Sequence, residues 1–133
     1  MKKNILALLI IFVLIIPVFT GCQEETGLTK EERIEAFVKD LNNPLRSGIY
    51  KKHFNTTSTL HNLPDLTSIT LFPVAVQPQL YSVESIKSTL LSSILTVIIK
   101  GPFDSSTKET FTFTMKNEGN TGKDDWYIFL IVP

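Results

Sequence analysis

The chain has 133 residues, of which 43% are hydrophobic, and it balances 13 basic against 13 acidic side chains. Setting aside the very apolar first 21 residues, with Lys2 and Lys3, leaves 11 basic and 13 acidic side chains, a net charge of −2. No basic field remains that would hold nucleic acid, so nucleic acid is not an expected partner. The remaining chain is long enough for one globular domain with its own core.

The first 21 residues have the pattern of a signal peptide. Lys2 and Lys3 supply the positive start, Ile5 to Ile16 form an unbroken apolar stretch, and Pro17 ends it. A dozen or so apolar residues are too few to span a bilayer, which takes roughly 20 residues of helix. The segment therefore predicts export of the protein.

Cys22 is the only cysteine of the chain and directly follows the small residues Thr20 and Gly21. The segment from Phe19 to Cys22 resembles the lipobox of bacterial lipoproteins. That resemblance implies cleavage before Cys22 and a diacylglyceryl group on its thiol, which makes Cys22 the predicted lipid attachment site. Lipidation also accounts for an unpaired thiol in an exported protein.

A lipidated Cys22 would anchor the mature protein to a bacterial membrane, because two acyl chains bind a bilayer stably where one is marginal. Gln23 in place of Asp resembles proteins sorted to the outer membrane, so we expect the outer membrane or cell surface in a double-membraned bacterium. Residues 22–28 form a short tether that keeps the domain within about 20 Å of the lipid. The predicted organisation is thus a signal peptide at 1–21, a tether at 22–28 and one domain at 29–133.

A capping-box pattern, Thr29 followed three residues later by Glu32, predicts the start of a helix. Apolar residues at i, i+3, i+4 and i+7 then form one stripe, which we expect in the core: Ile34, Phe37, Val38 and Leu41. A second helix is predicted to begin at Pro44, because proline suits the first helical position. Its apolar side would carry Leu45, Ile49 and Phe54.

The stretch from Asn55 to Leu80 contains three prolines and no sustained period, so we expect an irregular packed connection. Residues 69–71 and 74–76 have the composition of short strands, which Pro73 would confine to a sheet edge. A connection of this length is unusual in a compact domain unless it has a packing or functional role.

The last third predicts four strands, rich in β-branched and aromatic residues, at 81–89, 94–100, 110–116 and 126–132. The loops between the later strands are polar and contain glycine, so neighbouring strands should pair as antiparallel hairpins in a meander. The predicted fold class is therefore α+β, with N-terminal helices packed on a curved antiparallel sheet of about four strands.

Two of these strands, at 94–99 and 126–132, are apolar on both faces, as strands covered on both sides would be. Helices would cover only one face. We expect Trp126 in the core, and strict alternation would put Tyr127, Phe129 and Ile131 on the face opposite to it. The second face would be covered by the Asn55 to Leu80 connection, or it would meet a ligand, the membrane surface, a second copy of the chain or another envelope protein.

The layout resembles the nuclear-transport-factor-2-like superfamily over residues 29–132. The resemblance lies in an N-terminal helix pair, a strand from Tyr81 to Ile86 and a closing strand that begins Trp126-Tyr127-Ile128. A cystatin-like arrangement of a helix on a sheet is the nearest alternative. The superfamily resemblance implies a cone-shaped domain, in which some members hold small molecules and some isomerise or dehydrate them.

Motifs for catalysis and cofactors are missing from the sequence, which has no glycine-rich phosphate loop, no second cysteine and no HExxH. We therefore predict no cofactor, no metal and no catalytic residue. The weak metal candidate would join His53 and His61 to a carboxylate such as Asp65. His53 follows two lysines and is expected instead at a solvated basic helix end.

An enzyme of the superfamily type would need a buried carboxylate, either Asp65 or Glu84, opposite a tyrosine such as Tyr50 or Tyr81. Glu84 alternates with an apolar neighbour and is expected to face water. The sequence therefore favours a membrane-anchored envelope lipoprotein that acts as a non-catalytic interaction module. The alternative is a cone-shaped small-molecule binder or, behind it, an isomerase- or dehydratase-like enzyme, because fold alone does not decide function.

Overall fold

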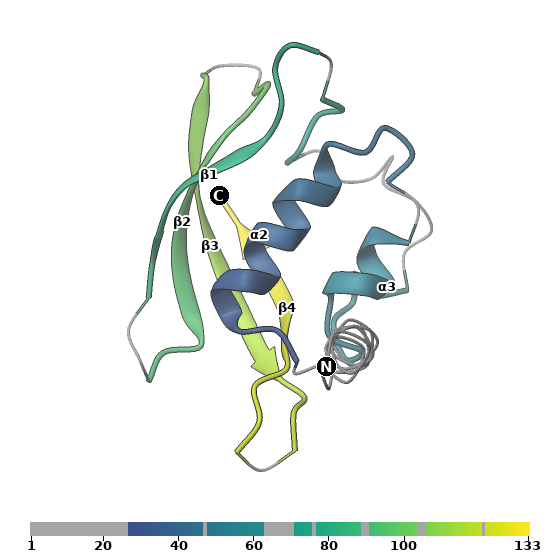
Figure 1. Ribbon diagram of the computed structural model, residues 1–133, viewed down its shortest axis with the longest axis vertical. Helices are drawn as coiled ribbons and strands as arrows, with labels where there is room; N and C mark the ends of the chain where they lie inside the picture. Colours follow the sequence, from purple (N-terminus) through teal and green to yellow (C-terminus); the bar gives the residue numbers. More distant parts are fainter. Residues whose placement is uncertain are drawn as a thin grey trace, which may run out of the picture.

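The computed structural model describes residues 27–46, 48–62, 71–75, 77–88, 91–103, 106–120 and 122–133. Within these ranges the chain forms two helices and one four-stranded antiparallel sheet, which confirms the predicted α+β class (Figure 1). The predicted signal peptide, Cys22 and Asp65 lie outside the described residues. None of the described helices is long and apolar enough to cross a membrane.

Helix α2, Lys30–Leu41, begins and packs as its sequence predicts. The Thr29 side chain accepts from the Glu32 backbone N–H at 3.2 Å, and the Glu32 carboxylate accepts from the Thr29 N–H at 2.9 Å. These two bonds satisfy backbone donors at the helix start. The predicted apolar stripe lies in the core, with every member at most 2% exposed: Ile34, Phe37, Val38 and Leu41.

Helix α3 is shorter than predicted and spans Ile49–His53. The predicted start at Pro44 is wrong, because the backbone first passes through positive φ angles at Arg46 (43°) and Gly48 (70°). A positive φ interrupts a right-handed helix, so helical geometry begins only after Gly48. Leu45, expected on the apolar side of the helix, is accordingly 79% exposed.

The sheet consists of β1, Ser82–Lys87; β2, Ile94–Lys100; β3, Lys108–Asn117; and β4, Trp126–Val132. Strands that follow one another along the chain pair antiparallel, in the order β1-β2-β3-β4, which confirms the predicted meander. β2 and β4 have the predicted bounds, and β3 extends beyond its prediction at both ends. Figure 1 shows α2 lying across one face of the sheet.

Aromatic rings fill the space between α2 and the sheet. Phe37 of α2 lies among four rings that it meets edge-on, at centroid distances of 5.7 to 6.2 Å: His53, Phe54, Phe72 and Phe113. All five side chains are at most 1% exposed. Packed rings therefore fill the space between α2 and the sheet around Phe37.

The described parts of the long connection pack on the helix side of the sheet and along one edge of it. Phe72 stacks on Phe111, a core residue of β3, with a centroid distance of 4.8 Å. Asn55 lies beside β4, and its backbone N–H donates to the Ile128 carbonyl at 2.8 Å. Residues 71 and 74–75 form no strand, which corrects that prediction, and the remainder of the two short segments lies outside the described residues.

Candidate interaction surface

Strand β2 is buried on one face only. Leu95, Val97 and Ile99 point into the core and are fully buried, whereas Ile94 is 52% exposed. The prediction that this strand is covered on both faces is therefore wrong for the part of the chain that the structure describes. Its second row of side chains lies on the face of the sheet opposite α2.

A bulge in β4 changes which of its residues share a face. Consecutive residues of β3 pair with Leu130 and Ile128, so Phe129 is skipped. Ile128 and Ile131, three residues apart, are both buried, while Leu130 and Val132 are 44% and 41% exposed. The predicted strict alternation is wrong, because the extra residue of a bulge breaks the two-residue repeat of the strand.

Trp126, predicted in the core, packs against it from the rim and stays partly exposed. Its indole N–H donates to the Asp124 carboxylate at 3.0 Å, and the Lys30 ammonium lies 5.2 Å from its ring centroid. Its ring therefore contributes to core packing while its polar edge reaches the surface.

The strand register gathers one set of side chains on the face away from α2, which we call the outer sheet face. Its centre combines aliphatic side chains with threonine hydroxyls, and its ends carry charge. Its members are Ser82, Ser85 and Lys87 of β1, with Glu84 placed there by its ion pairs; Ile94, Thr96, Ile98 and Lys100 of β2; Lys108, Thr110, Thr112, Thr114 and Lys116 of β3; and Leu130 and Val132 of β4. Exposed apolar groups clustered in this way usually mark an interaction site.

Among its described residues, the Asn55 to Leu80 connection touches the outer sheet face only at one corner, where the Lys116 ammonium donates to the Thr57 hydroxyl at 3.0 Å. Ser58 reaches only the edge of β4, where its hydroxyl donates to the Phe129 carbonyl at 2.8 Å. Phe72 packs on the opposite face of the sheet. In Figure 1 the described part of the connection runs on the side of α2 and α3 before it turns into β1.

Glu84 joins two lysines at one end of the outer sheet face. Its carboxylate oxygens lie 3.3 Å from the Lys100 ammonium and 3.2 Å from the Lys108 ammonium. The bonds to Lys108 and Lys100 lower the pKa of the Glu84 carboxyl group. Glu84 is exposed, as predicted. A base poised for catalysis near neutral pH needs a raised pKa, so this carboxylate does not have the properties of one.

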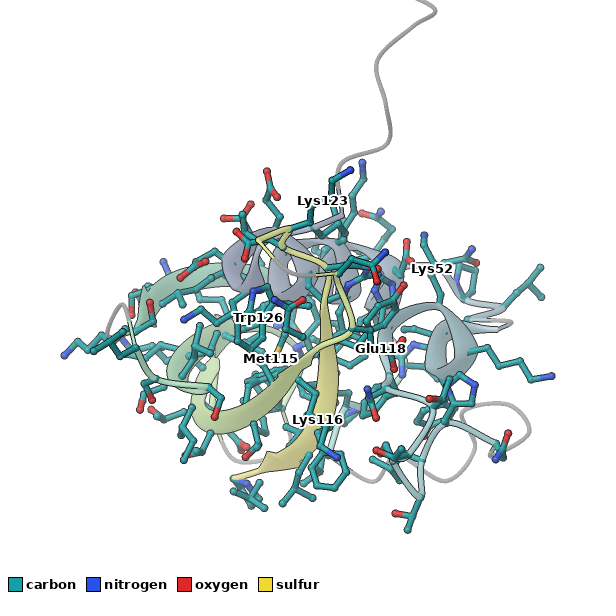
Figure 2. All side chains as sticks on the ribbon, turned by 90° about the horizontal axis from the view of Figure 1, so that it is seen from below. Lys52, Met115, Lys116, Glu118, Lys123 and Trp126 are labelled. Atoms are coloured by element: carbon teal, nitrogen blue, oxygen red, sulfur yellow. The ribbon has the colours of Figure 1, made fainter. Side chains whose placement is uncertain are left out.

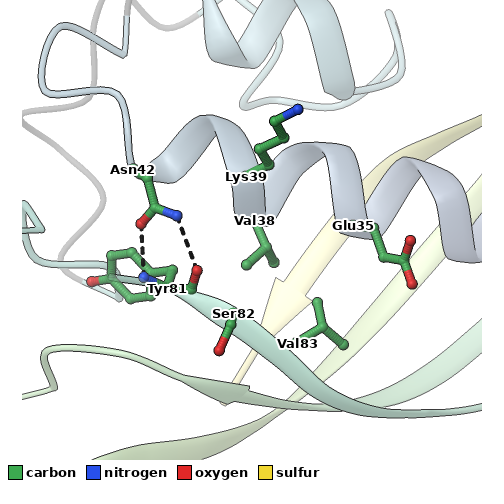
Figure 3. A pocket seen from close by; sticks show the side chains of 7 residues that line it. All are labelled: Glu35, Val38, Lys39, Asn42, Tyr81, Ser82 and Val83. Carbon is green, nitrogen blue, oxygen red and sulfur yellow. Dashed lines mark hydrogen bonds between the residues drawn. The ribbon is translucent and has the colours of Figure 1, made fainter. Parts of the chain in front are cut away.

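A groove of about 290 Å³ lies between α2 and the start of β1 (Figure 3). At one end the Asn42 amide donates to the Tyr81 carbonyl at 2.9 Å and accepts from the Tyr81 N–H at 2.7 Å. Asn42 thus replaces a neighbouring strand at this point of the sheet edge. The charged side chains that line the groove, Glu35 and Lys39, are both exposed. The groove therefore lacks the buried carboxylate that an acid–base site would need.

Asp40, which no sequence pattern singled out, binds two side chains of α3. One of its carboxylate oxygens lies 2.7 Å from the Lys52 ammonium and 2.7 Å from His53 Nε2. Burial raises the pKa of Asp40, but the bonds to Lys52 and His53 outweigh it and the net shift is downward. An ionised carboxylate only accepts hydrogen bonds, so His53 donates from Nε2.

His53 is fully buried, so the prediction of a solvated helix end is wrong. Burial lowers the pKa of its ring although the Asp40 carboxylate acts in the opposite direction. Its Nδ1 has no hydrogen-bond partner among the described residues, and the Phe37 ring packs against it. The half-buried Asp40 therefore joins α2 to the buried His53 of α3 at the edge of the core.

The two histidines have separate partners. His61 Nδ1 is bonded to the Phe54 carbonyl at 2.8 Å, whereas His53 is bonded to Asp40. Across the described ranges no group of three or more histidine, cysteine, aspartate or glutamate residues could hold a metal ion. Asp65, the third ligand of the weak metal candidate, is outside those ranges.

The two candidate tyrosines are both buried. The Tyr81 hydroxyl donates to the Pro73 carbonyl at 2.5 Å. The Tyr50 hydroxyl has no hydrogen-bond partner in the described part of the chain, and burial raises its pKa. Glu84 lies on the outer sheet face, so the structure does not bring it together with a buried tyrosine.

Comparisons with protein family models, with curated proteins and with solved structures find no match to this chain. The assignment of a role therefore depends on the chemistry of its own surface and of its N-terminal segment.

Proposed function

We propose that this protein is a lipid-anchored envelope protein that acts as a non-catalytic interaction module, with the outer sheet face as its binding surface. The observation that carries this proposal is the exposure of Ile94, Leu130 and Val132 on a sheet whose other face is a packed core. Covering aliphatic surface releases about 25 cal/mol per Å², which gives a partner a reason to bind there.

The anchoring part of the proposal rests on the segment from Phe19 to Cys22. The place where the domain begins is compatible with it. The Leu28 carbonyl accepts from the Trp126 N–H at 2.9 Å, and a Cβ on Gly27 would lie only 2.3 Å from the Asp124 carbonyl oxygen. The chain is thus fixed at one end of the sheet five residues after Cys22, a stretch that reaches about 20 Å at most.

A distant relation to the nuclear-transport-factor-2-like superfamily remains part of this proposal. Its support is the order of elements, a helix pair followed by a four-stranded antiparallel meander, and a cystatin-like layout is the alternative. The rings around Phe37 favour an interaction module over a cone-shaped binder or an isomerase-like enzyme, because they fill the space between α2 and the sheet.

Two protein partners fit the outer sheet face, a second copy of the chain or another envelope protein. A two-fold dimer would bury the aliphatic row of each copy against the other. It would also bring together lysines that have the same charge, a repulsion that salt screens.

The anchor is tested by metabolic labelling with a fatty-acid probe, followed by membrane fractionation. The wild-type protein should be labelled and retained by membranes, and Cys22→Ser should be neither. Labelling of the Cys22→Ser protein, or a wild type that is never labelled, would show that Cys22 is not the attachment site.

A further inference from the structure

The charges of this domain are distributed unevenly between its two faces. The outer sheet face has four lysines and one glutamate, a net charge of +3: Lys87, Lys100, Lys108, Lys116 and Glu84. The described residues outside this face carry seven basic and eight acidic side chains, a net charge of −1. A domain with this asymmetry turns its basic face toward a negative surface.

The lysines of β1, β2 and β3 flank a mixed centre of aliphatic and threonine side chains. Ile94 and Leu130 are opposite Thr114 on its two neighbouring strands, and Val132 is opposite Thr112. Lys100 and Lys108 stand opposite each other at one end of the sheet, and Lys116 lies near the other end. Figure 2 shows Lys116 on the side of the sheet away from α2, and Lys123 on the helix side.

The predicted tether joins the domain beside the Lys116 end of this face. The Leu28 carbonyl accepts from the Trp126 N–H, and Trp126 pairs with Asn117 of β3, next to Lys116. β3 has 10 residues, which at about 3.3 Å per residue make a strand of roughly 33 Å. A tether of up to about 20 Å at one end leaves room for the sheet to lie flat on the bilayer.

We propose that the outer sheet face binds the anionic lipid surface of the membrane to which the protein is anchored. This inference rests on the proposed Cys22 anchor for the nearness of the bilayer. Lysine ammonium groups bind anionic headgroups while their apolar stems stay in contact with the bilayer. The exposed aliphatic side chains of this face, Ile94, Leu130 and Val132, enter the interfacial layer, as the apolar face of an amphipathic element does.

Lipid is favoured over a second copy of the chain by charge. Two outer sheet faces would each bring a charge of +3 to one interface, and like charges there oppose binding. An anionic bilayer supplies the opposite charge at every lysine. An acidic protein would satisfy the lysines too, and the experiment below separates that outcome from lipid.

The experiment places a polarity-sensitive fluorophore on a single new cysteine of the full lipidated protein, reconstituted in vesicles. Thr96→Cys reports the outer sheet face, and Glu35→Cys on α2 is the matched control, because both positions are exposed. With phosphatidylglycerol in the vesicles, the Thr96 label should be shielded from an aqueous quencher, and with phosphatidylcholine alone it should be accessible. The Glu35 label should be accessible in both.

Charge reversal tests the cause of the shielding. Lys87→Glu with Lys100→Glu should expose the Thr96 label in phosphatidylglycerol vesicles, with the bound population falling by about tenfold or more. Lys39→Glu with Lys51→Glu changes the net charge equally but lies on α2 and α3, and it should leave the shielding unchanged.

Two results would overturn the proposal: equal access to the Thr96 label in both kinds of vesicle, or shielding in both with cross-links between copies. The second result would replace lipid by a homodimer. If mass spectrometry finds no lipid on Cys22, the anchor proposal fails by itself. The lipid proposal would then be supported if the protein sediments with phosphatidylglycerol vesicles and not with phosphatidylcholine vesicles, and refuted if it sediments with neither.

Discussion

The Arg33 guanidinium of α2 donates from Nε to the carbonyl oxygen of Trp126, across 2.7 Å. Its Nη1 also donates to the Lys52 carbonyl at 3.0 Å, and the guanidinium carbon lies 4.2 Å from the Tyr127 ring centroid. One buried side chain thereby holds the start of β4 and the end of α3 against α2.

Replacing Arg33 should therefore destabilise the whole domain. Arg33→Ala leaves two carbonyl groups without their donor, and we expect a loss of about 3 kcal/mol in the free energy of unfolding. Lys39→Ala, on an exposed position of the same helix, is the control and should change this free energy by less than about 0.5 kcal/mol. Urea unfolding followed by circular dichroism measures both, and equal losses would contradict the role of Arg33.

The two aromatic residues Phe37 and Trp126 should differ in their contribution to stability. Phe37 is fully buried among other rings, so Phe37→Ala should cost about 3 to 5 kcal/mol. Trp126 is partly exposed, so Trp126→Ala should cost clearly less, because part of its ring is already in water. Thermal unfolding ranks the variants, and a larger loss for Trp126→Ala would place that ring in the core.

The bulge at Phe129 predicts opposite behaviour for two neighbouring residues. Ile131 is buried, so Ile131→Glu places an unpaired carboxylate in the core and should prevent folding. Leu130 is on the outer sheet face, so Leu130→Glu should fold with nearly wild-type stability. It should lose the binding of the outer sheet face to anionic vesicles. Circular dichroism with thermal melting checks folding, and an unfolded Leu130→Glu protein would refute the assigned register.

Acid should destabilise the protein through His53. Burial lowers the pKa of His53 in the folded state below its usual value of 6.5. The unfolded chain therefore binds a proton at a higher pH than the folded chain does. The contribution of His53 to stability is complete above pH 6.5 and is lost as the pH falls through the folded-state pKa.

His53→Phe removes this titration while keeping a ring in the core. Its melting temperature should fall less than that of the wild type between neutral pH and about pH 5. Melting curves across this range measure the difference. An identical pH dependence in the two proteins would show that His53 does not titrate during unfolding.

Much of the fold follows from local sequence patterns. The capping box at Thr29, the stripe through Phe37 and the β-branched runs of β2 and β4 predict their elements because each pattern is complete within one segment. The sequence does not predict which face of the sheet the residues after Phe129 occupy. The bulge depends on pairing with β3, and no local sequence pattern marks it.

The polar core was equally hidden in the sequence. Arg33 and Asp40 are charged residues on an amphipathic helix, a pattern that is typical of the solvated face. Their partners come from β4 and α3, so only the packing of distant segments reveals their roles. The sequence did predict a sheet face without a helix on it, because β2 is apolar on both faces and one layer of helices covers only one of them. The position of the lysines on that face could be assigned only from the strand register.

The most direct test of the outer sheet face as an interaction surface is thiol accessibility in native membranes. Leu130→Cys and Glu35→Cys would be treated in intact membrane fractions with a water-soluble maleimide. The wild type should be unreactive, because lipid blocks its only thiol. We expect that Cys at position 130 is protected in membranes and reacts freely after detergent and high salt, while Cys at position 35 reacts in both. Equal and immediate reaction of both variants in native membranes would contradict it.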